Sequence, residues 1–252
     1  YIRHDIRAIR SNLGVCPQFS NTSVLFPELN VEEHLQFYCK LKNTSLSATE
    51  ISQQVMEMID KLDLVDKRQV ASCRLSGGMK RRLSIGISLI GGSSIVLLDE
   101  PGSNMDIAGQ RFVWELLLRE KTTRCIVVST HSMMEADILG DQVAIMASGR
   151  LQCCGSPLQL KKRYGAGYQL TIRKRELEVV TDMITNMVTQ YIAGAALQNT
   201  AGIELTYSLP SADDNQPLEQ LLSRLENDDD RNRLGVTTYT IAVTTLTEVF
   251  FK

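Results

Sequence analysis

Two acidic residues, Asp99 and Glu100, directly follow the apolar run 95-IVLL-98. This run predicts a strand buried on both faces of a parallel sheet, and the acids would then lie at the carboxyl edge, where α/β proteins bind ligands. One carboxylate there can hold Mg²⁺, usually through water, and the other can orient and deprotonate an attacking water. A strand that simply ends in a polar turn explains the pair equally well, so further residues must decide.

A second candidate site is the segment 75-LSGGM-79. Ser76 is a good N-cap, and two glycines at a helix start let an anion approach the free backbone N–H groups. The helix dipole also favours negative charge at this end. The alternative is a glycine-containing loop before an ordinary helix. A basic cluster follows, and the Asp-Glu strand comes shortly afterwards, so we favour a phosphate-binding helix start.

His131 and Gln18 complete the set of candidate residues. His131 follows a second buried run, 125-CIVVST-130, and should share the sheet edge of Glu100, within reach of a γ-phosphate. Gln18 ends the short predicted strand 14-GVCPQ-18 and could complete a magnesium shell or sense it. A structural histidine and a solvent-facing glutamine are the commoner roles of such residues. The hypothesis therefore depends on all of these side chains meeting at one edge.

The elements that would position these residues alternate between helices and strands. Asn30 with Glu33, and Ser47 with Glu50, are capping pairs that begin two helices. This alternation predicts an α/β fold with a parallel-sheet core. Further helices are expected at 76–90, around 110–120, just past His131 and after Ser156-Pro157, with an antiparallel hairpin around the turn 147-ASGR-150.

The pattern changes after residue 165. Across 168–243 the order strand, helix, strand, strand, helix, strand predicts a small ferredoxin-like α+β module, and 244–252 predicts a closing capped helix. The acidic run 227-NDDD-230 is interpreted as a solvated loop. We therefore expect two domains, 1–165 and 166–252.

Composition argues against several classes of function for this chain. The chain has 252 residues, 43% hydrophobic and 22% charged, which suits a soluble chain with a real core. A net charge of -2 argues against a nucleic-acid partner, and the basic cluster 80-KRR-82 is expected to be a solvated helix face. The six cysteines have no zinc-ligand spacing and predict reduced thiols. No apolar run reaches the ~18 residues that span a bilayer.

Taken together, the order Gln18, 75-LSGGM-79, Asp99-Glu100, Asp106 and His131 resembles the nucleotide-binding domain of ATP-binding cassette (ABC) transporters. The resemblance implies that these are the Q-loop, signature, Walker B with catalytic Glu, D-loop and switch His. Finer segments resemble subfamily A, the lipid-exporter branch, whose regulatory domain would be 166–252. These segments are 14-GVCPQ-18, 31-VEEHLQFY-38, 75-LSGGMKRRLS-84, 129-STHSMMEAD-137, 145-IMASGRLQCCGSP-157 and 244-TTLTEVFFK-252.

The resemblance implies an ATPase site with ATP and Mg²⁺ as cofactors. In this family two cassettes stack head to tail, so the signature would close over ATP held by a second cassette. The remaining motifs would serve the chain's own site. The implied roles are catalytic for Glu100 and His131, metal-binding for Gln18 and Asp99, and nucleotide-binding for Gln18, Leu75, Ser76, Gly77, Gly78 and Asp106.

The resemblance also implies a truncated P-loop NTPase-type cassette, with a parallel-sheet core and a helical signature subdomain, followed by the ferredoxin-like domain. The family's phosphate loop would precede Tyr1, so we interpret the chain as a fragment that is inactive alone. In the whole protein it would power lipid transport through transmembrane domains. This region would lie on the cytosolic side of a membrane transporter, with no nucleic-acid partner.

Three departures from the family pattern motivate an alternative. The D-loop begins 102-GSN-104 instead of Thr-Ser/Ala-Gly, Ile107 replaces the usual Pro, and the loop 19-FSNTS-23 is longer than expected. A weak or inert cassette could act as a regulatory or interaction module that completes a partner's ATP site through the signature. A soluble ABC ATPase without a membrane partner is a third possibility. An intact Gly-x-x-x-x-Gly-Lys-Ser/Thr upstream would favour the first hypothesis.

Overall fold

The computed structural model describes residues 6–18, 24–165, 167–175, 181–210, 216–243 and 245–250. The chain forms two compact units, the first ending at Leu139 and the second starting at Gly140. The predicted domains, 1–165 and 166–252, have a different border, because they follow the change in the order of strands and helices along the sequence and not compactness. They stay a prediction.

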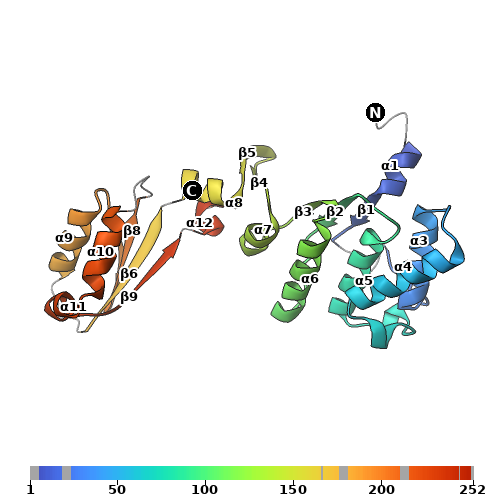
Figure 1. Cartoon of the computed structure of the whole chain (residues 1–252), viewed down its shortest axis with the longest axis horizontal. Helices are drawn as coiled ribbons and strands as arrows, with labels where there is room; N and C mark the ends of the chain where they lie inside the picture. The colour runs from blue at the N-terminus through green and yellow to red at the C-terminus, as the bar shows by residue number, and fades with distance from the viewer. Residues whose placement is uncertain are drawn as a thin grey trace. The chain divides into compact units, whose positions relative to one another are not determined.

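A three-stranded parallel sheet forms the centre of the first unit (Figure 1). Its strands are β1 (Leu13–Cys16), β2 (Ile95–Asp99) and β3 (Cys125–Ser129), in that spatial order. Cys16 pairs with Leu98, and Asp99 pairs with Ser129. All three strands therefore end at one edge, and the predicted parallel-sheet core is confirmed.

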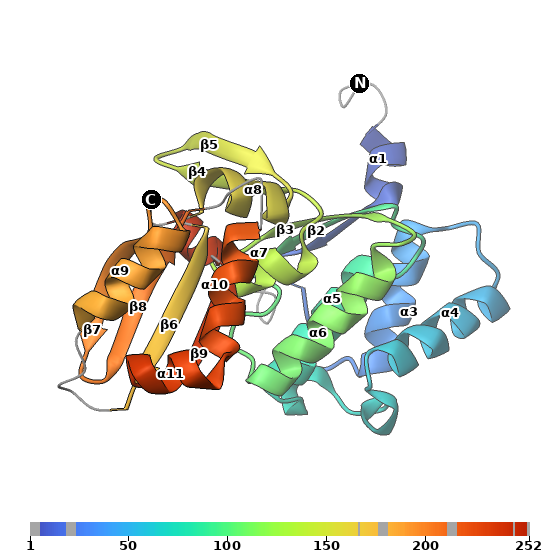
Figure 2. The ribbon, with the colours of Figure 1, turned by 60° about the vertical axis from the view of Figure 1, so that its left-hand side comes forward.

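Helices α5 (Gly77–Leu89) and α6 (Ile107–Glu120) contribute to the core on one face of this sheet (Figure 2). Helix α5 lies so close to β1 that a Cβ at Gly14 would be 1.9 Å from the carbonyl oxygen of Ser88. Only glycine fits there. The buried side chains of this core include Cys16, Val96 and Leu98 from the strands and Leu83, Ile87, Val113 and Leu117 from the helices.

The opposite face of the parallel sheet is exposed among the described residues. Alternate side chains of each strand emerge on it, and their exposed fractions run from 37% to 53%. The prediction that 95-IVLL-98 is buried on both faces is therefore wrong for these residues, because the helices pack against only one face. The open face carries Val15, Ile95, Leu97 and Val127.

The other helices of the first unit begin where their caps predict. Helices α3 (Val31–Lys42) and α4 (Ala48–Lys61) have complete capping boxes at Asn30 and Ser47. They pack against each other and contribute buried side chains to the same core. The shorter elements are α1 (Ile6–Asn12), the 3₁₀ turns η1 (Val65–Lys67) and η2 (Ser72–Arg74), and α7 (Met133–Leu139).

The second unit contains a hairpin and a four-stranded antiparallel sheet. The sheet has the strand order β7 (Ala196–Ala201), β8 (Glu204–Leu209), β6 (Tyr168–Lys174) and β9 (Val236–Val243), and helices α9 (Thr181–Tyr191) and α10 (Gln216–Glu226) share its core. The predicted ferredoxin-like βαββαβ order is confirmed. The other elements are β4 (Val143–Ala147), β5 (Arg150–Gly155), α8 (Pro157–Tyr164), α11 (Asp228–Leu234) and α12 (Leu246–Phe250).

The acidic run after residue 226 is a helix start and not the predicted loop. The Asn227 side chain accepts hydrogen bonds from the backbone N–H groups of Asp229 and Asp230 and so caps α11. Negative charge in a first turn is favourable beside the helix dipole. The predictions for 19-FSNTS-23 and for a helix start at 176–180 lie outside the described residues.

All six cysteines are free thiols. Over the described residues, none of the helices is both long enough and apolar enough to cross a bilayer.

Candidate functional site

The backbone turns sharply at Glu100, directly after β2. Its φ of 52° lies in the left-handed region, which costs a non-glycine residue on the order of 1–3 kcal/mol unless neighbours hold it. Two backbone bonds hold it here. The Glu100 N–H donates to the carbonyl of Ser129 at 2.9 Å, and the Glu100 carbonyl accepts from the N–H of Ser103 at 3.0 Å. The turn therefore places the Glu100 side chain beyond the sheet edge.

The Glu100 carboxylate is bound twice by His131. One oxygen accepts from the His131 backbone N–H at 3.0 Å, and the other lies 2.7 Å from Nδ1. The Glu100 side chain is 16% exposed, whereas that of His131 is 81% exposed. The hydrogen bond to Glu100, and then its charge, raise the pKa of His131. A held carboxylate beside an exposed imidazole is suited to proton transfer from water.

Asp99, the last residue of β2, is exposed at the same edge. Its Oδ1 accepts a hydrogen bond of 2.5 Å from the hydroxyl of Ser129, its partner on β3. Ser129 was missed as a site residue, although its place at the end of a predicted strand beside β2 is a usable signal. The hydroxyl orients the carboxylate and leaves it accessible.

The donors at this edge fit Mg²⁺. In the described part of the chain no three His, Cys, Asp or Glu side chains group as a metal site. Mg²⁺ does not require such a cage, because it usually binds one or two protein oxygens together with phosphate and water. The exposed Asp99 carboxylate and the exposed Gln18 amide are oxygen donors of this kind.

The Arg81 side chain reaches the strand ends from α5. It is only 5% exposed, so the prediction that 80-KRR-82 is a solvated helix face is wrong at this position. Its guanidinium donates to the backbone carbonyls of Pro17, Gln18, Asp99, Glu100 and Pro101 at 2.5–3.2 Å. The sequence spacing could have predicted this burial, because Arg81 lies one helical turn before Ile85 and therefore on the same, buried face of the helix.

The segment 75-LSGGM-79 begins α5 as predicted. The Ser76 hydroxyl accepts from the Met79 N–H at 3.3 Å. Within the described residues, the N–H groups of Gly77 and Gly78 have no hydrogen-bond partner. A Cβ at Gly77 would meet nothing within 4 Å. This end can therefore receive an anion, with the buried Leu75 contributing at most its backbone.

The turn 102–106 lies against this helix start. The methyl carbon of Met105 is 3.7 Å from where a Cβ on Gly78 would be. Asp106 caps α6, and its carboxylate accepts from the Gly109 N–H at 2.8 Å. The carboxylate thus has a structural partner, and a contact between Asp106 and nucleotide stays a prediction.

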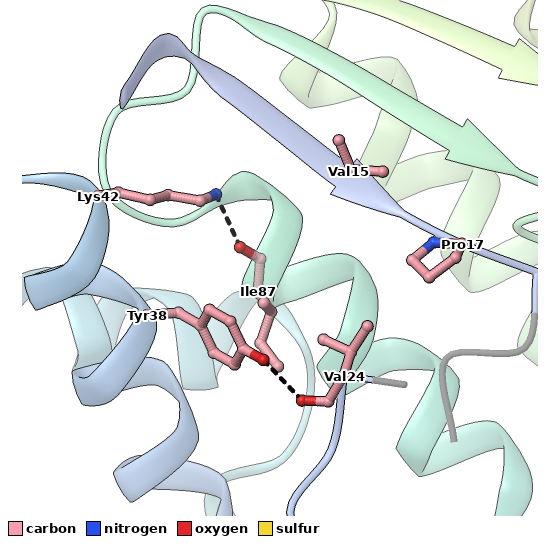
Figure 3. A pocket seen from close by; sticks show the side chains of 6 residues that line it. All are labelled: Val15, Pro17, Val24, Tyr38, Lys42 and Ile87. Atoms are coloured by element: carbon pink, nitrogen blue, oxygen red, sulfur yellow. Dashed lines mark hydrogen bonds between the residues drawn. The ribbon is translucent and has the colours of Figure 1, made fainter. Parts of the chain in front are cut away.

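A cavity of about 310 Å³ beside β1 is a separate feature (Figure 3). Its polar groups are already bonded. The Tyr38 hydroxyl donates to the Val24 carbonyl, and the Lys42 ammonium bonds three carbonyls at the end of α5 and the Ser93 hydroxyl. Burial lowers the pKa of Lys42 to about 8. This cavity therefore offers a ligand little polar recognition.

Comparison with known proteins shows which proteins this chain is similar to. The family described as "ABC transporter" matches residues 2–103, and an "ACT-like domain" family matches residues 168–246. Over 251 residues the chain is 45% identical to "Phospholipid-transporting ATPase ABCA3" of Mus musculus, covering 100% of this chain and 14% of that protein. The chain is homologous over its whole length to ABC transporters of subfamily A.

A second relative carries a subfamily A name, and a solved structure shares the fold of part of the chain. "ATP-binding cassette sub-family A member 2" of Rattus norvegicus is 41% identical over 275 residues, covering 99% of this chain and 11% of that protein. The solved dimeric structure of the ATP-binding cassette MJ0796 bound to ADP and Pi has a TM-score of 0.53 at 22% identity. It covers 60% of this chain and 65% of that chain, and shows the ABC cassette fold.

In the terms of ABC cassettes, the described site residues form two groups. The residues predicted as Q-loop, Walker B acids and switch His lie together at the carboxyl edge of the parallel sheet, where Arg81 bonds the Gln18 and Glu100 carbonyls and His131 bonds the Glu100 carboxylate. The segments predicted as signature and D-loop are in contact at the start of α5. The structure therefore brings together the residues of each group that were predicted from the sequence, and Arg81 is the side chain that reaches from the signature helix to the sheet edge.

Proposed function

We propose that this chain contributes the water-activating edge and the signature of an ATPase that powers phospholipid transport. The single observation that carries the proposal is Glu100, held in a left-handed turn by Ser129 and Ser103 and bonded twice by His131. The substrate class rests on the relative named "Phospholipid-transporting ATPase ABCA3". The chain spans 14% of that protein's length, so the transport activity belongs to the whole protein.

Glu100 is the general base in the proposed reaction. Its carboxylate takes a proton from water as the water oxygen attacks the γ-phosphorus of ATP, and the bond from that phosphorus to the ADP oxygen breaks. His131 is exposed, and Glu100 raises its pKa, so its imidazolium persists to higher pH and can face the γ-phosphate. Asp99 and Gln18 would hold Mg²⁺, which would supply positive charge to neutralise the phosphates.

The signature serves a second ATP-binding cassette. Its free Gly77 and Gly78 N–H groups point out of a helix start, where they suit the phosphate of a nucleotide held by that partner. The solved cassette MJ0796, which shares the fold, is described as a dimer. Head-to-tail pairing would therefore place the two groups of motifs in two different ATP sites.

The proposed ATPase also needs a phosphate-binding loop, which these 252 residues do not supply. The sequence contains no Gly-Lys pair, and no described loop cradles a β- or γ-phosphate. We therefore expect the isolated chain not to hydrolyse ATP. In the whole protein, membrane domains would couple hydrolysis to phospholipid movement, with this region on the cytosolic face.

The proposal is tested on the whole protein in phosphatidylcholine vesicles that carry a fluorescent phospholipid. Glu100→Gln should abolish ATP hydrolysis and phospholipid movement and should retain ATP binding. Glu115→Gln makes the same chemical change at an exposed position of α6 away from the site and should keep both activities. Unchanged hydrolysis in Glu100→Gln would refute the assignment. Hydrolysis without phospholipid movement in the unaltered protein would refute only the transport part.

A further inference from the structure

The buried Arg81 side chain joins three segments that are far apart in the sequence. It extends from α5, which begins at the signature. Nη1 donates to the carbonyls of Pro17 at 2.7 Å and Gln18 at 3.1 Å. Nη2 donates to the carbonyls of Asp99 at 2.5 Å and Glu100 at 2.8 Å. Nε donates to the carbonyl of Pro101 at 3.2 Å.

This arrangement is the geometry that a guanidinium, and no other side chain, can provide. Its planar fork presents donors in several fixed directions, whereas an ammonium is a compact point charge with three donors. A buried cation is costly unless hydrogen bonds compensate it, and here the carbonyls at the ends of β1 and β2 do so. The two strand ends are therefore fixed relative to α5 by one side chain.

One of these bonds acts on the strained residue of the site. The Glu100 carbonyl accepts from both the Ser103 N–H and Arg81 Nη2. These bonds help to keep the Glu100 backbone in the left-handed region. Without them, the backbone would relax toward conformations that non-glycine residues ordinarily adopt. Arg81 thus determines where the Glu100 carboxylate lies without touching it.

We propose that Arg81 is a positioning residue that couples the signature helix to Glu100 and Gln18. The inference rests on the proposed ATPase function. When the signature engages a partner's nucleotide, α5 moves as a rigid body, and the guanidinium transmits that movement to the ends of β1 and β2. The two ATP sites of a cassette pair are then linked through the interior of each cassette.

Arg82 provides a matched control in the next position. Its guanidinium bonds the carbonyl of Leu62 at 3.1 Å and the carboxylate of Asp63 at 3.0 Å, and it lies 5.0 Å from the centre of the Phe112 ring. None of these groups belongs to the strand ends. A lysine at this position should therefore leave the site geometry unchanged.

The test compares Arg81→Lys and Arg82→Lys in the whole protein. We expect Arg81→Lys to lower kcat for ATP by about 10- to 100-fold, because small misplacements of catalytic groups have effects of this size, while KM changes by less than about twofold. Arg82→Lys should change neither. Amide exchange at Asp99 and Glu100 in the nucleotide-free protein should become faster in Arg81→Lys alone, which a general loss of stability would not confine to this turn.

Each outcome decides between the two proposals. If the unaltered protein does not hydrolyse ATP, the proposed function fails, and amide exchange at Asp99 and Glu100 still tests the link from Arg81 to Glu100. If the unaltered protein is active and Arg81→Lys matches Arg82→Lys in kcat and exchange, the positioning role is overturned. Arg81→Gln is the second variant, and failure of both Arg81 variants to fold would show a purely structural role.

Discussion

The two sheets of this protein differ in the face that their helices leave open. On the parallel sheet of the first unit, the open face is apolar and half exposed. On the antiparallel sheet of the second unit, polar side chains alternate with the buried core positions, and Thr171 lies opposite Thr206 and Thr240 on the neighbouring strands. The first face carries Val15, Ile95, Leu97 and Val127, and the second carries Thr171, Thr206, Ser208, Thr238 and Thr240.

This difference reflects two uses of a sheet. Antiparallel sheets commonly keep one solvated face, so the second unit needs no further cover on that side. Parallel sheets are normally covered on both faces, and exposed apolar surface of this kind usually marks an interaction site. The parallel sheet also gathers its strand ends at one edge, where Asp99, Glu100 and Arg81 meet. The candidate site therefore lies on the first unit.

The largest expected effect is at Gly14, where helix α5 lies close to strand β1, and a glycine in an open turn of the second unit is its control. Gly14→Ala places a Cβ 1.9 Å from the Ser88 carbonyl and should lower the free energy of unfolding of the first unit by at least about 3 kcal/mol. Gly202→Ala, in the turn between β7 and β8, meets nothing within 4 Å and should cost the second unit about 1 kcal/mol for its positive φ. Urea unfolding measures the first through the fluorescence of Trp114, the single tryptophan. Hydrogen exchange of the second unit measures the effect of Gly202→Ala. Equal losses of stability in the two variants would contradict the close approach of α5 to β1.

The two faces of β2 give the next test. Leu98 is 2% exposed on the covered face, and Leu98→Ala should cost about 2–5 kcal/mol. Leu97 is 37% exposed on the open face, and Leu97→Ala should cost less than about 1 kcal/mol in this chain. Urea unfolding, followed by the fluorescence of Trp114, measures the free energy of unfolding of both variants. A large loss in Leu97→Ala would show that the open face is covered in solution.

The second unit should respond weakly on its open face. Thr171→Val should change the free energy of unfolding by no more than about 0.5 kcal/mol, because it lies on the solvated face. Tyr207 is fully buried, and its hydroxyl is 2.9 Å from that of Thr185. Tyr207→Phe should cost about 0.5–1.5 kcal/mol through loss of that bond. Hydrogen exchange of β8 measures both, and the reverse order would contradict the assignment of faces.

The smallest effect is a change in the pKa of His131. Glu100 raises this pKa, so the contribution of the pair to stability is present below the ordinary value of 6.5 and is lost as the pH rises through the raised pKa. Glu100→Gln should lower the pKa of His131 in an NMR titration. Burial lowers the pKa of His34, which lies away from the site and should titrate unchanged. An unchanged His131 would contradict the pairing.

Local signals in the sequence predicted much of this structure. The capping boxes at Asn30 and Ser47 and the alternation of strands and helices were confirmed, because they depend on neighbours in the chain. The meeting of Glu100 and His131 followed from the shared edge of parallel strands. Arg81 was misjudged because its five carbonyl partners come from distant segments. The open face of β2 was also missed, since covering it depends on packing that an apolar run alone does not reveal.

The central claim is that Glu100 activates water at the edge of the parallel sheet. The most direct test is single-turnover hydrolysis of bound ATP by the whole protein, measured together with the Kd for ATP. The account predicts that Glu100→Gln binds ATP with a Kd within about threefold of the unaltered protein and slows cleavage by at least about 100-fold, as expected for loss of a general base. Cleavage at the unaltered rate in Glu100→Gln would contradict it.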